Sequence, residues 1–236
     1  ANLQYHESYT PPMQALGIEC HYLPYVRSVS QYLENFGEQY DAVILSRADT
    51  AEKIIDQVKQ FCPNAKILFD TVDLHFLREQ REAELANDPS LKESATERKI
   101  QELTIARKAD TTLVVSPVEL ELFQQEAPDV KINLLSNVHQ IYDSATTFNE
   151  RRDILFIGGF EHPPNIDAMY WFLDEIYPLL QKENPDINLH IVGGHVPSQL
   201  QAKASEQIKF LGFVSDIKPL FDSVKLSIAP LRYGAG

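Results

Sequence analysis

The feature of this 236-residue sequence that most constrains its fold is a strand, a glycine pair and a helix in direct succession. Residues 153–157 form a short, mostly apolar run of the kind that makes a buried parallel strand. Gly158 and Gly159 follow, and their missing side chains leave the backbone free to turn and open to a ligand. The amphipathic run that starts at Pro163 predicts a helix, with Asn165 as its N-cap. Because the start of a helix attracts anions, this segment predicts an anion site.

The same succession repeats through the rest of the chain. Further strands are predicted over residues 188–192, 208–211 and 225–229, and Gly193-Gly194 follows the first of them. Strands that alternate with helices pair in parallel, and their loops gather at the carboxyl edge of the sheet, where ligands bind. The second half of the chain is therefore predicted to be a Rossmann-like α/β domain.

The first half also alternates between helices and strands. Its predicted helices cover residues 11–16, 29–36, 50–61, 76–86 and 91–108, with another from Pro117, and its predicted strands cover residues 18–23, 41–46, 65–69, 111–115 and 131–135. Ser116 and Glu119 form the Ser-x-x-Glu pattern of a capping box. Residues 137–152 are polar and have little periodicity, so we place the linker there. The predicted domains are residues 1–145 and 146–236.

Four motifs follow one another in the second half: Phe-Ile-Gly-Gly-Phe from Phe156, His-Pro-Pro-Asn-Ile-Asp-Ala from His162, Leu-Gly-Phe-Val-Ser-Asp-Ile from Leu211, and Ala-Pro-Leu-Arg-Tyr-Gly-Ala-Gly from Ala229. In this order they closely resemble the donor-binding domain of group 1 (family-four-type) glycosyltransferases. The resemblance covers residues 153–236 continuously, and a weaker version covers the first half. It implies the GT-B fold, which is an α/β fold of two Rossmann-like domains whose parallel sheets face each other across a cleft.

The resemblance also implies an activity. It implies transfer of a glycosyl group from a nucleotide-diphosphate sugar to an acceptor hydroxyl, with retention of anomeric configuration and no obligatory metal or other cofactor. The second domain would hold the donor, and the first would present a glycan or lipid-linked acceptor. The sequence starts at Ala1 in a polar stretch and stops at Gly236, where a glycine loop should lead into a helix. We therefore expect both domains to be incomplete and other domains to belong to a longer polypeptide.

The candidate donor-binding residues come from these motifs. A diphosphate needs backbone N–H groups at close range, which glycine loops offer, although glycine also ends strands in any α/β sheet. By resemblance, one pair of residues packs against the base and a later loop wraps the phosphates and the sugar. The candidates are Gly158, Gly159, Asn165, Gly193, Gly194, Phe213, Val214, Arg232, Tyr233, Gly234 and Gly236.

Two of these candidates have an equally good structural explanation. Phe213 would serve as well in core packing as against a base. Arg232 could hold a phosphate through two parallel hydrogen bonds, or it could be an ordinary surface arginine.

The candidate catalytic residues cluster after a predicted strand of the first half: Asp73, His75 and Arg78, with Asp70 beside them. A carboxylate could stabilise the oxocarbenium character of the reacting sugar, and an imidazole could hydrogen-bond to its hydroxyls or phosphate. The resemblance places a His-Asp-type segment near the transferring sugar. The alternative is structural, because Asp70 or Asp73 could simply cap the helix that starts near Leu74.

Composition excludes several other classes of protein. The net charge of −13 argues against broad nucleic-acid binding and against a generally basic membrane-facing surface. No apolar run approaches the ~20 residues of a membrane span. Cys20 and Cys62 are too few and too isolated for a disulfide framework, and His190 and His195 lack a carboxylate or Cys partner at metal-ligand spacing. We expect a cytoplasmic protein without a metal site, either free or peripheral at the inner membrane face.

Two other function classes stay open. Many members of the family carry two glutamates in the final loop and the helix after it; Tyr233 stands at the first of these positions, and the second would lie beyond Gly236. That departure keeps open a second class, a non-catalytic, degenerate module of a larger protein. A receiver-like nucleotide-binding domain could use Asp70 and Asp73 as an acidic pocket, but it does not explain the second half.

Overall fold

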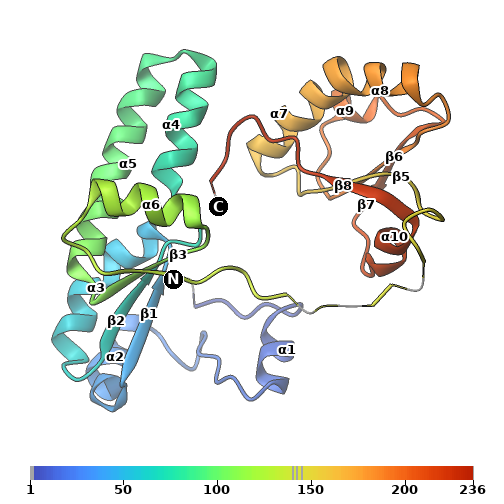
Figure 1. The fold of residues 1–236 in the computed structure, drawn as a ribbon. Coiled ribbons are helices and arrows are strands. Elements are labelled where there is room, and N and C mark those ends of the chain that lie inside the picture. The colour runs from blue at the N-terminus through green and yellow to red at the C-terminus, as the bar shows by residue number, and fades with distance from the viewer. Residues whose placement is uncertain (1–2, 140, 142, 145, 236) are drawn as a thin grey trace. The chain divides into compact units, whose positions relative to one another are not determined.

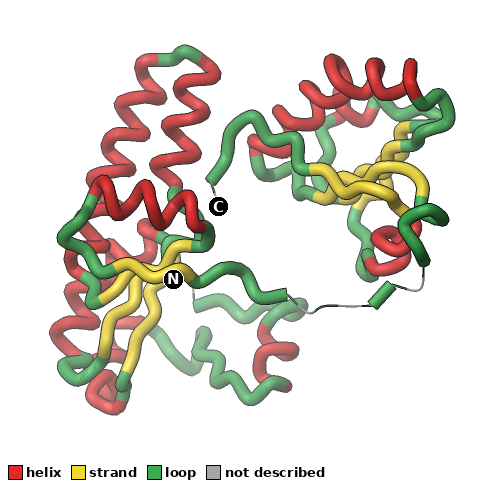
Figure 2. Tube along the Cα trace, viewed as in Figure 1, coloured by secondary structure: helices red, strands yellow, loops and turns green. Residues whose placement is uncertain are grey.

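The computed structural model describes residues 3–139, 141, 143–144 and 146–235. These residues form two compact units, one that runs to Val138 and includes Ala235, and one that runs from His139 to Gly234. Each unit contains a parallel four-stranded sheet with helices packed on it (Figures 1 and 2). The predicted α/β class with two Rossmann-like sheets is therefore confirmed, whereas the domain boundary near residue 145 and the cleft between the domains stay predictions.

The sheet of the first unit runs in sequence order. Its strands are β1 (Ala42–Ser46), β2 (Lys66–Asp70), β3 (Thr111–Val114) and β4 (Ile132–Leu134), and its helices are α1 (Thr10–Ala15), α2 (Val29–Phe36), α3 (Ala48–Phe61), α4 (His75–Ala86), α5 (Pro89–Lys108) and α6 (Pro117–Glu126). Ile67 and Phe69 on β2 are buried in one core with Ile55 and Val58 of α3. This core fixes the carboxyl ends of β1 and β2 side by side, with Ser46 opposite Asp70.

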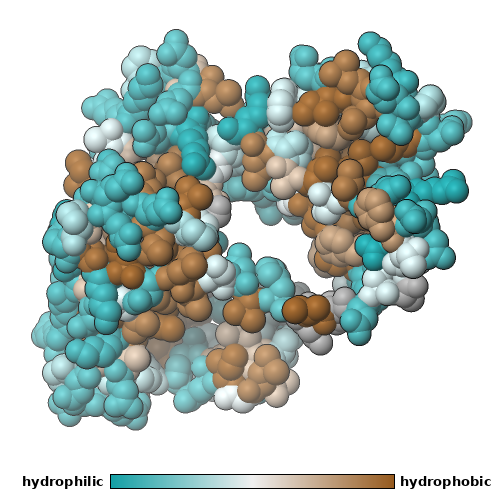
Figure 3. Space-filling model, viewed as in Figure 1, coloured by the Kyte–Doolittle hydropathy of each residue, from teal (hydrophilic) through white to brown (hydrophobic). Residues whose placement is uncertain are grey.

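The strand predicted over residues 18–23 is wrong. Residues 18–22 have no regular structure, and the Leu23 N–H donates to the Leu3 carbonyl instead of to a strand of the sheet. Ile18 and Leu23 are about half exposed, so burial does not drive them into the sheet. Figure 3 shows apolar side chains gathered on the surface around α1, which precedes this segment.

The sheet of the second unit has the strand order β7-β6-β5-β8. Its strands are β5 (Arg152–Ile157), β6 (Leu189–Val192), β7 (Ile208–Gly212) and β8 (Val224–Ile228), and its helices are α7 (Pro163–Trp171), α8 (Tyr177–Glu183), α9 (Ser198–Gln201) and α10 (Lys218–Ser223). Ile154 and Phe156 belong to one core cluster, while Leu155 belongs to another with Val192 and Val224. Since successive side chains of a strand point to opposite faces, the centre of β5 (residues 154–156) is continuously apolar because both of its faces are covered there.

The long helix predicted after the first glycine pair forms, but with a wide turn inside it. A π-helical turn (Phe172–Ile176) separates α7 from α8. Pro178 explains it, because proline has no N–H and its ring collides with the carbonyl four residues earlier in a regular α-helix. Met169, Leu173 and Tyr177 nevertheless face the core, as their spacing predicts.

We predict that Leu155→Ala lowers the free energy of unfolding by about 2–5 kcal/mol, because it leaves a cavity at a fully buried position. Ile157→Ala on the same strand is the matched control, since Ile157 is 38% exposed and should cost much less. Urea unfolding of the two variants measures both values. Equal losses would contradict the assignment of β5 as a strand covered on both faces.

Candidate functional site

The two glycine loops of the second unit lie against each other at the carboxyl edge of its sheet. Gly158-Gly159 follows β5 and Gly193-Gly194 follows β6, and these two strands are neighbours. The Phe160 N–H donates to the Gly194 carbonyl over 3.1 Å, which joins the two loops directly. The structure therefore brings both predicted glycine pairs into one place.

Within each pair the two glycines have different roles. A Cβ on Gly158 would lie 2.7 Å from Nδ2 of Asn165, and a Cβ on Gly193 would collide with the Gly158 carbonyl oxygen. A Cβ on Gly159 or on Gly194 would meet no described atom within 4 Å. The first glycine of each pair is thus required by packing, while the second presents bare backbone to open space.

Asn165 is not the N-cap of α7, so that prediction is wrong. The N-cap is His162, because Pro163 and Pro164 begin the helix and their fixed φ suits its first turn. Asn165 lies in that turn, where its Nδ2 donates to the Gly159 carbonyl over 2.8 Å. Asn165 therefore holds the first glycine loop against the helix.

The start of α7 offers fewer amide donors to an anion than an ordinary helix start. Pro163 and Pro164 have no N–H, and the Asn165 N–H donates to the His162 carbonyl over 3.0 Å. An anion at this edge would depend on the amides of the glycine loops and on nearby side chains.

Arg232 lies in the loop after β8 and is paired with Asp167 of α7. Its Nε donates to Oδ2 of Asp167 over 2.8 Å, and its Nη2 donates to Oδ1 of the same carboxylate. The hydrogen bond and charge of Asp167 raise the pKa of the Arg232 guanidinium above its ordinary value. Of the next predicted residues, Tyr233 is buried, Gly234 lies beside the Leu231 side chain, and Gly236 lies outside the described residues.

The two residues after β7 point to different surroundings. Phe213 is 84% exposed, so the alternative that it packs in the core is wrong. Val214 is partly buried against the cluster that contains Leu155. The pair therefore presents one exposed aromatic ring at the carboxyl edge, next to a residue anchored in the core.

In the first unit, Asp73 contacts both of the other predicted catalytic residues, His75 and Arg78. Asp73 Oδ1 lies 3.1 Å from Nε2 of His75, and Asp73 Oδ2 accepts a hydrogen bond from Nη1 of Arg78 over 2.5 Å. Burial acts to raise the pKa of Asp73, but the hydrogen bond from His75 and the charges of His75 and Arg78 outweigh it and lower that pKa. Asp73 is therefore an ionised carboxylate that orients an imidazole and a guanidinium.

Two buried glutamates, which the sequence did not single out as site residues, hold the start of α4. Glu102 accepts the N–H of His75 over 3.1 Å and the N–H of Phe76 over 3.2 Å. Glu119 accepts the N–H of Leu74 over 2.9 Å, and both glutamates are only 1% exposed. Burial raises the pKa of Glu102 to about 7, although these amides and the charge of His75 act in the opposite direction.

The prediction that Asp70 or Asp73 caps α4 is wrong, because its N-cap is Leu74, which makes no side-chain cap bond. Asp70 instead accepts the Val72 N–H over 3.1 Å and the Ser46 hydroxyl over 2.9 Å. Val72 has a φ of +67°, a rare and strained value for a β-branched residue. The turn that carries Asp73 is thus held in place by both neighbouring strands.

The capping box at α6 forms only in part. The Ser116 hydroxyl accepts the Glu119 N–H over 3.2 Å, as predicted. The Glu119 carboxylate, however, accepts the Val115 N–H and the Leu74 N–H, so it joins two loops and does not return to its own cap residue.

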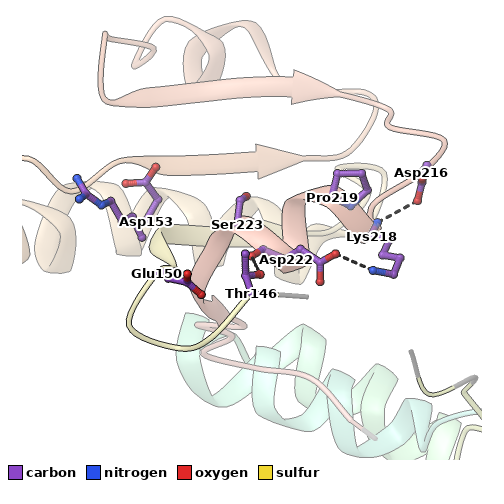
Figure 4. A pocket seen from close by; sticks show the side chains of 9 residues that line it. Thr146, Glu150, Asp153, Asp216, Lys218, Pro219, Asp222 and Ser223 are labelled. Atoms are coloured by element: carbon purple, nitrogen blue, oxygen red, sulfur yellow. Dashed lines mark hydrogen bonds and ion pairs between the residues drawn. The ribbon is translucent and has the colours of Figure 1, made fainter. Parts of the chain in front are cut away.

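A separate pocket of about 640 Å³ lies at the amino end of β5 (Figure 4). Asp153 on its wall makes a 3.1 Å contact with Nε2 of His190, and Lys218 pairs with Asp222. None of the candidate donor-binding residues lines it.

The described residues contain no group of three or more His, Cys, Asp or Glu side chains placed to hold a metal ion. Among those residues, no helix has both the length and the apolar character needed to cross a membrane.

We predict that Glu102 makes the protein less stable as pH rises. Its pKa is about 7 in the folded state and about 4.5 ordinarily, so the folded state binds this proton more tightly and the free energy of unfolding should fall between these pH values. Glu102→Gln cannot titrate, so its stability should change less with pH over this interval. Urea unfolding of both proteins between pH 5 and 8 tests this, and parallel pH curves would contradict it.

Comparison with known proteins finds a family model that matches part of the chain. Residues 151–236 match the family model described as "Glycosyl transferases group 1". A 93-residue stretch is 30% identical to an uncharacterised 44.6 kDa protein of the cps region of Klebsiella pneumoniae, covering 36% of this chain and 24% of that protein.

Solved structures show the same fold at low sequence identity. A variant of TarM from S. aureus, in complex with fondaparinux, alpha-GlcNAc-glycerol and UDP, matches with a TM-score of 0.61 at 15% identity, over 84% of this chain and 38% of that one. Sucrose-phosphate synthase from Thermosynechococcus elongatus matches with a TM-score of 0.57 at 15% identity, over 92% of this chain and 58% of that one. The chain thus spans less than two thirds of each of these proteins. The fold is therefore that of the GT-B glycosyltransferases, and residues 151–236 match the group 1 glycosyl transferase model.

Proposed function

We propose that this chain belongs to a retaining glycosyltransferase that moves a sugar from a nucleotide-diphosphate sugar to an acceptor hydroxyl. The observation that carries the proposal is the pair of open glycines, Gly159 and Gly194, side by side at a carboxyl sheet edge within the segment that matches the family. Bare amides at such an edge suit a diphosphate. No obligatory metal or other cofactor is part of this proposal.

The second unit would bind the donor. The diphosphate would lie over Gly159 and Gly194, within reach of Arg232 in the neighbouring loop. The exposed ring of Phe213 offers an apolar surface for the base. The UDP complex of TarM supports a nucleotide donor on this fold, and the nucleotide of the present chain is left to experiment.

The first unit would act on the transferring sugar and on the acceptor, which we propose to be a glycan or a lipid-linked molecule. Asp73 contacts Nε2 of His75. If this contact is broken, Nε2 would be free to hydrogen-bond to a sugar hydroxyl or a phosphate. Arg78 supplies a positive charge beside them, which would favour the leaving diphosphate. Transfer then needs an acceptor hydroxyl in place of water, because water would hydrolyse the donor.

A second candidate is a non-catalytic module of a larger protein. Tyr233 favours it, because this residue is 7% exposed and stands where the resembled family carries an acidic residue. Nucleotide binding without any turnover of the donor would support this candidate, and turnover would exclude it.

We predict that Gly159→Val abolishes binding of nucleoside diphosphate. A Cβ at this position would meet no described atom within 4 Å, and the φ of Gly159 lies outside the left-handed range, so the fold should survive. Titration calorimetry with UDP, GDP and their sugars measures the binding. The exposed substitution Ala204→Val in the same unit is the control and should bind normally. If Gly159→Val binds nucleoside diphosphate with unchanged affinity, the loop at Gly159 does not bind the phosphates.

We predict that His75→Ala slows donor turnover by roughly 10²-fold or more while it changes stability far less, because a positioned imidazole contributes through hydrogen bonds to the reacting groups. The measurement is release of nucleoside diphosphate from the donor sugar, alongside thermal unfolding. His190→Ala is the matched control. His190 also makes a 3.1 Å contact with an aspartate, but it lies in the second unit, at the amino ends of the strands and away from the candidate donor site. Equal rates in both variants would return His75 to a structural role.

A further inference from the structure

We propose that Asp167 is a positioning residue: it holds the guanidinium of Arg232 so that its free edge binds a phosphate of the donor. The inference rests on the proposed donor site and names the residue that orders it. Asp167 is not among the predicted site residues, and its proposed role follows only from its contact with Arg232.

The contact uses one edge of the guanidinium and leaves another free. Arginine has five N–H groups in a planar fork, one on Nε and two on each terminal nitrogen. Asp167 accepts from Nε and from Nη2, which is a side-on pairing. Nη1 of Arg232 donates no hydrogen bond to any of the described residues. The edge formed by Nη1 and the second hydrogen of Nη2 can therefore hold two oxygens of one phosphate.

The position of this pair in the fold points to the same ligand. Arg232 follows β8 and Asp167 follows β5, and these strands are neighbours in the sheet. The carboxyl edge that carries the open Gly159 and Gly194 therefore also carries Arg232. Asn165, two residues before Asp167, holds the Gly159 carbonyl. The first turns of α7 thus hold a glycine loop through one side chain and the arginine loop through another.

An aspartate beside an arginine could also weaken phosphate binding, because it cancels positive charge. That effect is reduced here because the Arg232 and Asp167 side chains are 36% and 20% exposed, so water screens the charge of the pair. The orienting effect is not screened in this way. A free arginine loses much side-chain freedom when it binds, whereas Asp167 has already fixed Arg232 before the ligand arrives. We therefore expect orientation to outweigh charge cancellation.

The test is a double-mutant cycle in the 236-residue chain, with UDP and GDP as probes and calorimetry as the measurement. Asp167→Ala should weaken binding of the nucleoside diphosphate that the wild-type chain binds by about tenfold, whereas Asp167→Asn, which keeps one acceptor oxygen, should weaken it less. In an Arg232→Ala background, Asp167→Ala should have no further effect, because Asp167 acts through Arg232. The nucleoside alone, without phosphates, should bind all variants equally. Thermal unfolding of each variant shows that the chain remains folded.

The outcomes separate this inference from the proposed function. If the wild-type chain binds none of the nucleoside diphosphates, the donor site and the role of Asp167 both fail. If it binds one of them and Asp167→Ala binds it equally well or more tightly, the donor site stands and Asp167 is not a positioning residue. A loss that persists unchanged in the Arg232→Ala background would also overturn the inference, because it would show that Asp167 acts without Arg232.

Discussion

The candidate donor site depends on a close approach between two backbones of the second unit. Gly193 lies so near the Gly158 carbonyl that a side chain on Gly193 would collide with it. This approach, with the hydrogen bond from Phe160 to Gly194, brings two strand ends into one surface. Only residues without a Cβ permit it. The next glycine in each loop, Gly159 or Gly194, would carry a Cβ that meets no described atom within 4 Å. One glycine of each pair thus permits the close packing, and its neighbour leaves the backbone open.

In the first unit, buried carboxylates instead of glycines hold the candidate site residues in place. Three consecutive amides at the start of α4 are turned inward, away from water, and buried carboxylates from α5 and α6 accept them. A buried amide without a hydrogen-bond acceptor would destabilise the fold, and Glu102 and Glu119 supply the acceptors. Their hydrogen bonds fix the segment that carries Asp73 and His75. A buried network thus sets the orientation of the buried His75 and of the partly buried Asp73.

Much of this fold could be predicted from the sequence, because strand-helix alternation is a local signal. The apolar run of β5 and the glycines after it indicated both the strand and the loop, since each depends on neighbouring residues. The errors have a shared cause. The N-cap of α7 was misassigned because two prolines moved the helix start, and the pairing of residues 18–23 failed because no strand of the sheet accepts them. Glu102 was missed because its partners lie 27 and 26 residues earlier in the chain. Asp167 was missed because it meets Arg232 only across the folded sheet, 65 residues away.

The most direct test of the donor site is to follow the backbone amides of individual glycines by NMR while UDP, GDP or their sugars are added. Binding at the carboxyl edge of the second sheet predicts saturable shifts of the Gly159 and Gly194 amide signals. The amide of Gly37, in the first unit, serves as the reference and should stay unchanged. Shifts confined to the charged pocket at the amino end of β5, with Gly159 and Gly194 unaffected, would contradict the central claim.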